Sequence, residues 1–261
     1  VAFDIGRGPK GAWWVLGDRT QAPSGIGFSL ENRMATKRAF PEAYNQSHII
    51  QLSQFFGDFR NALEGLKATP NSQVGVLSPG RFNETYLEHA YIARYLGLSL
   101  LGGEDLVVRD GRVMVRTISG LEPIDVLWRR LDGIWADPLE LEETSFLGVA
   151  GLVGAIRDQG VTMVNALGSG ILETRAMLAF IPKIAEVLNG KPLSMPNIAT
   201  WWTGQDGPSE EVKANAENLI IGDAFSTRLP FDLESGSENY VDDVPWGYRT
   251  VEHWIDGQGA D

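Results

Sequence analysis

The chain has 261 residues, of which 43% are hydrophobic and 21% charged, so it is long enough to bury the core of one or two globular domains. Its 34 acidic and 22 basic residues give a formal charge of -12, which argues against nonspecific binding to nucleic acid or to an anionic membrane, because both require a cationic surface. The absence of cysteine excludes disulfides, thiolate nucleophiles and cysteine-ligated metals, and it fits a soluble protein in the reducing cytoplasm.

Residues 1–5 have the pattern of a strand and lack a signal sequence, as expected of a chain that begins inside a longer one. Aromatic and β-branched residues predict a second strand over 12–16. Turn-forming residues 17–27 interrupt this pattern, and helical spacing resumes over 30–40. Residues 49–66 carry an apolar stripe that predicts a helix packed on a sheet. This order predicts a strand, a glycine-bearing loop and a helix at a ligand site.

The rest of the chain alternates between strands and helices. The predicted strands are residues 74–77, 124–131, 161–164 and 218–221, and the predicted helices are residues 84–96, 148–157, 173–188 and 210–216. Asp110-Gly111 between two β-branched runs predicts an antiparallel hairpin over 106–116. The alternation predicts an α/β fold with a mostly parallel sheet flanked by helices and an antiparallel hairpin. The acidic tail, residues 231–261, is expected to be irregular.

Two glycine loops follow predicted strands. They contain Ser24, Gly25 and Gly27 in the first loop and Asn165, Gly168 and Gly170 in the second. The first precedes a helix, where free N–H groups and the helix dipole can hold a phosphate. The second lies at the carboxyl edge of the sheet, where open α/β folds bind ligands. Both are equally consistent with turns that only reverse the chain, and neither has the P-loop pattern or a full dinucleotide fingerprint.

Arg129 and Arg130 lie at the end of a predicted strand, and Asp132 follows them. Strand alternation directs the two arginines to opposite faces, so at most one can face a shared pocket. Arginine at a sheet edge suits bidentate recognition of a carboxylate or phosphate. A structural ion pair with Asp132 or Asp137 explains the same residues equally well.

Polar residues also gather where the helix 84–96 begins. Asn83 is expected to cap this helix, and His89 is expected at the surface or at the edge of the core. The three histidines are too far apart in sequence to predict a metal site. No nucleophile elbow, zinc-binding HExxH motif or kinase signature is present, so phosphate-dependent chemistry remains by elimination.

Five sequence blocks extend over roughly residues 3–223. They are WWVLGDRTQAPSGIGFSLENR, SPGRFNETYLEHAYIARYLG, DLVVRDGRVMVRTISGLEPIDVLWRRLD with DPLEL after it, VNALGSGILETRAMLAFIP, and MPNIATWW. Their order resembles that of the circularly permuted ATP-grasp family (type 2), whose better-known relative is glutathionylspermidine synthetase.

The resemblance implies an ATP-grasp-like scaffold and a ligase that phosphorylates a carboxylate with ATP, so that an amine captures the acyl phosphate. It implies ATP and Mg²⁺ as cofactors, because magnesium between the phosphates lowers the charge barrier. The implied substrates are small-molecule or peptide carboxylates and amines. By position in the blocks, it implies metal ligands at Asp4 and Asp18, nucleotide-binding residues at Ser24, Gly25, Gly27, Asn165, Gly168, Gly170 and Arg175, and catalytic residues at Arg129, Arg130 and Asp132.

The chain departs from the family pattern at charged positions. Active members usually have Glu-Asp-Asn where this chain has residues 17–19, Gly-Asp-Arg, and the charge of Arg19 opposes a bound cation. Arg175 stands where the family commonly has a lysine, and Gly222 stands where the last strand usually carries one. Weak binding of ATP and Mg²⁺ is therefore expected.

Two functions remain open at this point. One is an ATP-dependent carboxylate–amine ligase, and the other is a noncatalytic binding or scaffold protein of the same fold that pairs with an active relative. The ligand pocket is expected near Asp18, Ser24, Arg129 and Asn165. The expected organisation is an N-terminal ATP-grasp-like part (1–72), an α/β substrate-side domain (73–200), and the start of a further ATP-grasp segment with the acidic tail (201–261).

Overall fold

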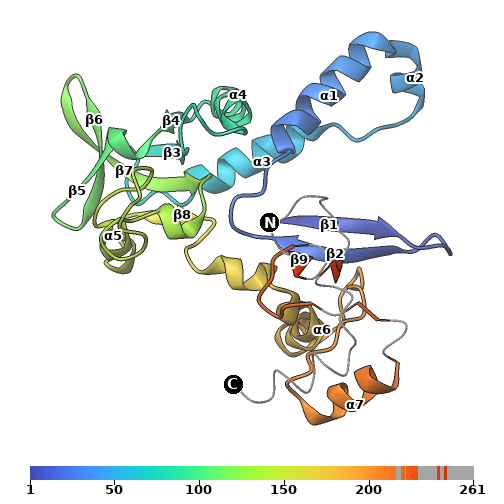
Figure 1. Ribbon diagram of the computed structural model, residues 1–261. Coiled ribbons are helices and arrows are strands. Elements are labelled where there is room, and N and C mark those ends of the chain that lie inside the picture. Colours follow the sequence, from blue (N-terminus) through green and yellow to red (C-terminus); the bar gives the residue numbers. More distant parts are fainter. Residues whose placement is uncertain (216–218, 221, 229–239, 242–243, 246–261) are drawn as a thin grey trace. The chain divides into compact units, whose positions relative to one another are not determined.

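The computed structural model describes residues 1–215, 219–220, 222–228, 240–241 and 244–245. The chain divides into two compact units (Figure 1). The central unit comprises residues 21–168, and the terminal unit comprises residues 1–20 with the described residues from 169 onward. The three-part domain organisation expected from the sequence stays a prediction. Within the described ranges, no helix is long and apolar enough to cross a membrane.

The central unit is built on a six-stranded mixed sheet with the strand order β4-β3-β7-β6-β5, and β8 pairs with β7. Its strands are β3 (Gln73–Leu77), β4 (Ser99–Leu101), β5 (Leu106–Arg109), β6 (Arg112–Thr117), β7 (Gly120–Arg129) and β8 (Thr162–Val164). The pairings of β3 with β4, of β3 with β7 and of β7 with β8 are parallel, whereas β6 is antiparallel to β5 and to β7. The predicted fold class, a mostly parallel sheet with an antiparallel hairpin, is confirmed.

The predicted hairpin is formed by β5 and β6. Asp110 and Gly111 connect the strands with φ values of 50° and 74°, which is the left-handed pair that a type I′ turn requires. An ordinary side chain is strained in this conformation, and the residue types therefore fix the register of the hairpin.

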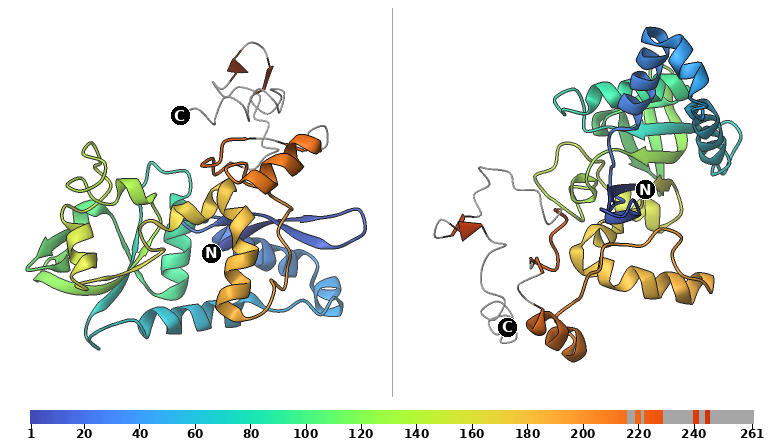
Figure 2. Two further views of the ribbon diagram at one scale, coloured as in Figure 1. Left: turned by 90° about the horizontal axis from the view of Figure 1, so that it is seen from below. Right: turned by 90° about the vertical axis from the view of Figure 1, so that its right-hand side faces the viewer.

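Helices cover both faces of this sheet. The helices of the central unit are α1 (Ile26–Ala39), α2 (Pro41–Gln46), α3 (Leu52–Glu64), α4 (Tyr86–Leu96) and α5 (Leu152–Arg157), with short 3₁₀ turns η1 (Gly103–Asp105) and η2 (Gly133–Trp135). Val76 and Trp128 face a cluster formed with α1, α3 and α4, whereas Leu77 and Leu127 face the α5 side. Figure 2 gives two further views of α4 and α5 on opposite sides of the sheet.

The terminal unit begins with an antiparallel hairpin of β1 (Ala2–Arg7) and β2 (Trp13–Arg19). The segment 196–198 lies along β2, since Val15 N–H donates to Pro196 O at 2.9 Å and Val15 O accepts from Ile198 N–H at 2.7 Å. The other elements of this unit are η3 (Ser169–Glu173), α6 (Arg175–Asn189), α7 (Asp206–Ala214), β9 (Tyr240–Val241) and β10 (Val244–Pro245).

Several predicted elements need correction. The strand expected at 12–16 is present as β2, but it pairs with β1 rather than joining the parallel sheet. Helix α2 was not expected, because it begins at Pro41 and has only six residues. Leu219 and Ile220 are not in a strand, and the other two residues of the expected strand 218–221 lie outside the described residues. The prediction for the tail falls largely outside the described residues as well.

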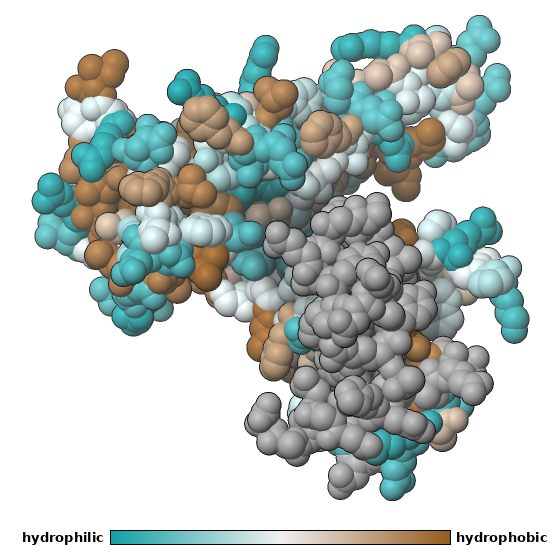
Figure 3. Space-filling view, viewed as in Figure 1, coloured by the Kyte–Doolittle hydropathy of each residue, from teal (hydrophilic) through white to brown (hydrophobic). Residues whose placement is uncertain are grey.

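The face drawn in Figure 3 mixes apolar and polar side chains, with apolar ones gathered over the β5–β7 end of the central unit. Exposed apolar side chains there include Ile118 and Leu121. Such exposure is common on folded proteins, and buried polar groups are more informative about a site.

The left-handed turn generates a stability prediction. Gly111→Ala should lower the free energy of unfolding by about 1 kcal/mol, because a Cβ is strained at φ 74°. Gly57→Ala is the matched control: Gly57 lies inside α3 and no described atom lies within 4 Å of a Cβ added there, so stability should rise by about 0.5–1 kcal/mol. Urea denaturation measures both, and a neutral Gly111→Ala would contradict the type I′ turn.

Candidate functional site

Six charged or titratable side chains of the central unit are buried: Asp125, Asp137 and four that lie on α4 and at the end of β7. Glu88 and His89 on α4 are each 3% exposed, and Arg129 and Arg130 at the end of β7 are 0% and 6% exposed. Burying a charge is costly unless hydrogen bonds or an opposite charge compensate it. The partners of these four residues therefore define the candidate site.

Glu88 binds the backbone of the first glycine loop. Its carboxylate accepts hydrogen bonds from Gly25 N–H at 2.8 and 3.0 Å and from Gly27 N–H at 2.9 Å. These are donors at the N terminus of α1, where the helix dipole favours a negative charge. The amides expected to hold a phosphate thus already donate to a carboxylate of the same chain.

The shape of the loop fits this contact. Gly25 has φ 106°, and a Cβ at Gly27 would lie 2.7 Å from Glu88 Cγ. A side chain at either position would be strained or would displace Glu88. The close approach of α4 therefore explains Gly27, and the left-handed φ explains Gly25, while Ser24 beside them remains exposed.

Arg130 holds the other side of the same loop. Its Nη2 donates to Pro23 O at 2.6 Å, and its guanidinium lies 5.0 Å from the centroid of the Trp128 ring. Burial lowers the pKa of Arg130 from its ordinary value, and the negative charge of Glu88 acts in the opposite direction. The two buried charges therefore compensate one another electrostatically.

The side chains beside this loop line a recess that is too narrow to admit a water molecule. Its lining residues are Ile26, Val76, Glu88, His89, Ile92, Trp128 and Arg130. Glu88, His89 and Ile92 come from α4, Trp128 comes from β7, and Arg130 follows β7 directly, while Ile26 and Val76 come from α1 and β3.

His89 stabilises the turn between β3 and α4 through hydrogen bonds. Its Nδ1 lies 3.0 Å from Ser78 Oγ, and its Nε2 lies 3.0 Å from Thr85 Oγ1. Thr85 Oγ1 donates its proton to Asn83 Oδ1 at 2.5 Å, so it accepts from His89, and the ring carries its proton on Nε2. Nδ1 then accepts from the Ser78 hydroxyl, which itself accepts from Gly80 N–H.

These contacts correct two predictions. His89 is buried rather than at the surface or core edge. The N-cap of α4 is Thr85, and Asn83 instead forms a turn ahead of the helix by accepting from Thr85 N–H at 3.0 Å.

Burial, followed by the positive charge of Arg130, lowers the pKa of His89 to about 4, although Glu88 acts to raise it. The ring is therefore neutral at neutral pH. A neutral ring agrees with the acceptor role of Nδ1 in the hydrogen-bond network.

Arg129 binds the second glycine loop. Its Nε donates to Asn165 O at 2.8 Å, and its Nη2 donates to Ala166 O at 3.3 Å. Asn165 has φ 62° and accepts from Trp128 Nε1–H through its side-chain oxygen at 3.1 Å. The arginine thus anchors the start of the loop to β7. Gly168 is exposed with φ 82°.

The opposite-face prediction for the two arginines agrees with these contacts, since Arg129 reaches the loop after β8 and Arg130 reaches the loop before α1. Asp132 is exposed after the strand. Asp137 is fully buried and accepts from Gly151 N–H at 3.1 Å and Val153 N–H at 2.9 Å, so it stabilises the start of α5.

Asp125 has a structural environment in the sheet. It is 5% exposed, and it accepts from Thr69 N–H at 2.9 Å and from Arg112 Nη2 at 3.1 Å. Burial alone would raise the pKa of Asp125, but hydrogen bonds from Thr69, Ser72 and Arg112 bring it below the ordinary value.

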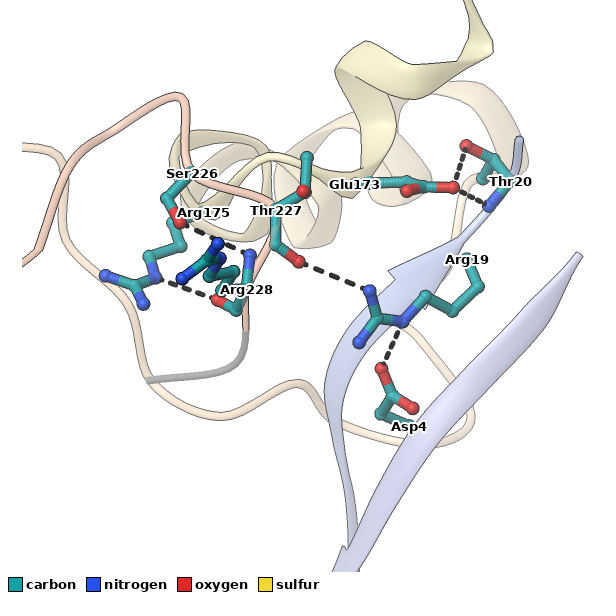
Figure 4. A network of polar contacts seen from close by, with 8 residues as sticks. All are labelled: Asp4, Arg19, Thr20, Glu173, Arg175, Ser226, Thr227 and Arg228. Carbon is teal, nitrogen blue, oxygen red and sulfur yellow. Dashed lines mark hydrogen bonds and ion pairs between the residues drawn. The ribbon is translucent and has the colours of Figure 1, made fainter. Parts of the chain in front are cut away.

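The remaining candidate residues belong to the terminal unit, where Figure 4 shows a network of polar contacts. Asp4 Oδ2 and Arg19 Nε form an ion pair at 2.7 Å, and Arg19 Nη1 donates to Thr227 O at 3.3 Å. Arg19, which stands where the family pattern has an uncharged residue, therefore pairs with Asp4, the carboxylate expected to bind a metal.

Asp18 lies close to this ion pair. Burial, followed by the negative charges of Asp4 and Glu173, raises the pKa of Asp18. Glu173 accepts from Thr20 N–H and lies 3.3 Å from Thr20 Oγ1. Over the described part of the chain, no group of three Asp, Glu, His or Cys side chains has the arrangement of a metal site.

The two other departures lie side by side. Arg175 begins α6, and its Nε donates to Arg228 O at 3.1 Å. A Cβ at Gly222 would lie 1.6 Å from Arg175 Nη1, so the guanidinium takes the space of a side chain at 222. The arginine at position 175 therefore requires a residue without a side chain at position 222. Gly170 lies within η3.

Sequence reasoning missed Glu88 as a site residue. It lies four and eight residues before Ile92 and Leu96, both buried, so helical spacing places this carboxylate on the apolar face of α4. A charge on an apolar face signals a buried partner. Its partners, the amides of Gly25 and Gly27, are 61 to 63 residues away and have no signal in the sequence.

Comparison with known proteins relates the chain to a family. The family model for circularly permuted ATP-grasp type 2 matches residues 1–235. An uncharacterised protein of Mycobacterium tuberculosis is 38% identical over 229 residues, which is 86% of this chain and 26% of the relative. A second from the same organism is 34% identical over 224 residues, 85% of this chain and 40% of the relative.

A protein of Synechocystis, also uncharacterised, is 36% identical over 225 residues, 85% of this chain and 46% of the relative. The chain thus spans between about a quarter and just under half of the length of these relatives.

The low pKa of His89 predicts a pH dependence of stability. Because the folded pKa of about 4 lies below the unfolded value of 6.5, the unfolded chain binds the proton more readily. Stability is fully present above pH 6.5 and should fall by about 3 kcal/mol between pH 6.5 and 4. Denaturant titrations across this range measure the loss.

His89→Gln should remove that part of the pH dependence. His48→Asn is the control, because His48 is exposed and asparagine tolerates its φ of 51°. If His89→Gln kept the wild-type slope between pH 6.5 and 4, the neutral buried ring would be ruled out.

Proposed function

The chain belongs to the circularly permuted ATP-grasp type 2 family, and from this premise we propose that it forms part of an ATP-dependent carboxylate–amine ligase. In such a reaction the carboxylate attacks the γ-phosphorus of ATP and ADP leaves. The amine then attacks the carbonyl carbon of the acyl phosphate and releases inorganic phosphate, leaving an amide. The family match across residues 1–235, which includes residues of both units, carries the proposal.

The α/β fold of the central unit supports this proposal, because both glycine loops are held by buried arginines from one strand. Arg130 binds Pro23 O and Arg129 binds Asn165 O, which fixes each loop relative to the end of β7. We assign the two arginines a positioning role. Ser24 and Asp132 are exposed next to them and are the side chains proposed to contact ligands.

ATP and Mg²⁺ are the cofactors that this family generally uses. The proposed metal ligands fit an ion poorly in this chain, because Asp4 is paired with Arg19 and the described residues contain no three-ligand cluster. The amides of Gly25 and Gly27 likewise already donate to Glu88. We therefore propose that this chain binds nucleotide and metal weakly.

A noncatalytic binding or scaffold protein is the second candidate. The Arg19–Asp4 ion pair favours it, because an arginine that neutralises a metal-ligand position removes what the reaction needs most. Such a protein would retain the loops for binding and would pair with an active relative.

Trapping of the acyl phosphate tests the ligase proposal without knowledge of the amine. The chain is incubated with ATP, Mg²⁺, hydroxylamine and pools of amino acids, peptides and other small carboxylates. A ligase should release ADP and form a hydroxamate only when its acid is present. A full-length mycobacterial relative assayed in parallel serves as the comparison. ADP release without acid dependence, or no hydroxamate from any pool with either protein, would count against the proposal.

Removal of the Arg19 charge tests the reason given for weak metal binding. Arg19→Asn should strengthen Mg²⁺ binding by about tenfold, since a positive charge in contact with a ligand carboxylate opposes a cation. Arg7→Asn removes the same charge from the exposed end of the same hairpin and should have no effect. Calorimetric titration of Mg²⁺ with and without ATP decides, and equal affinities in all three proteins would show that Arg19 does not limit metal binding.

A further inference from the structure

The carboxylate of Glu88 contacts the glycine loop through two of its backbone amides. Both Gly25 N–H and Gly27 N–H donate to it, at distances between 2.8 and 3.0 Å. An acceptor with full negative charge makes such hydrogen bonds short and strong. The N–H groups of Gly25 and Gly27, which could bind an external anion at the N terminus of α1, thus donate to a carboxylate of the same chain.

The steric fit is close on one side of the loop and open on the other. A Cβ at Gly27 would lie 2.7 Å from Glu88 Cγ and 3.2 Å from Ile92 Cγ1. A Cβ at Gly25 would meet no described atom within 4 Å, and Ser24 is exposed. Glu88 therefore supports the loop from α4 and leaves its outer side accessible.

Charge balance explains how a carboxylate is stable in this buried place. The dipole of α1 and the guanidinium of Arg130 are both positive toward Glu88. Arg130 is in turn fixed by Pro23 O, two residues before Gly25. The loop is thus held at its start by a cation from β7 and at its end by an anion from α4.

We propose that Glu88 is a positioning residue that acts as the resident anion of the loop 23–27. Its carboxylate sets the loop conformation and keeps the Gly25 and Gly27 amides from an incoming ligand, which instead meets the exposed Ser24 and the open side of Gly25. The inference rests on the proposed function only in calling this a ligand loop; the role of the carboxylate is independent of turnover.

Chemical rescue tests the proposal on the 261-residue chain. Glu88→Ala should lose the downfield proton shifts of the Gly25 and Gly27 amides in ¹⁵N–¹H spectra and should have a lower Tm. Added acetate should restore both the shifts and part of the Tm, because it replaces the missing carboxylate, whereas chloride at equal ionic strength should not. A side chain with a purely steric role would not be rescued by a small anion.

Two further proteins complete the experiment. Glu88→Gln preserves the size of the side chain and should fold with reduced amide shifts, which keeps the test available if the alanine variant does not fold. Glu84→Gln removes the same charge from an exposed site just before α4 and should behave as wild type.

Titration of the wild-type protein with ligands can overturn the proposal. Inorganic phosphate or ATP with Mg²⁺ should leave the amide signal of the buried Gly27 in place. Displacement of the Gly27 signal by either probe, or wild-type amide shifts in Glu88→Gln, would overturn the proposal. Failure of hydroxamate formation would affect only the ligase assignment, so the two conclusions are tested separately.

Discussion

The hydrogen bonds between the Glu88 carboxylate and the amides of Gly25 and Gly27 are the contact on which the glycine loop of the central unit depends. They join α4 to the start of α1 and require glycine where the two approach. They also explain a second buried charge, because Arg130 balances the carboxylate while it binds Pro23 O. Removing either charge would deprive the other of a favourable electrostatic interaction and leave it with its hydrogen bonds alone.

Local physics made most of the fold predictable. The Asp110-Gly111 pair predicted the hairpin because few residues adopt two successive left-handed conformations. The strands β3, β7 and β8 were predicted by short apolar runs, and α4 ended at Gly97, which has φ 69°. These signals act over a few residues. Local signals could not show that β2 pairs with β1, because that choice depends on which strand edge is available in three dimensions.

The candidate site was predictable in its residue types and less so in its contacts. The pattern correctly separated Arg129 from Arg130 by strand alternation. It did not anticipate that both arginines donate to main-chain oxygens, because the partners lie on loops about 36 and 107 residues away. The buried state of His89 was missed for a related reason: its neutral form depends on Ser78, Thr85 and Arg130 together.

Glycines and arginines at the expected positions are compatible with two different uses of the same motif. A glycine loop before a helix can receive an external phosphate, or it can receive a carboxylate of its own chain, since both are anions that suit free N–H groups. In this chain the second use is satisfied by Glu88, and in the terminal unit Arg19 similarly satisfies Asp4. Side chains of the chain itself thus occupy positions that the motif alone would assign to nucleotide and metal. The residues that identify the family are therefore also the ones from which weak cofactor binding is expected.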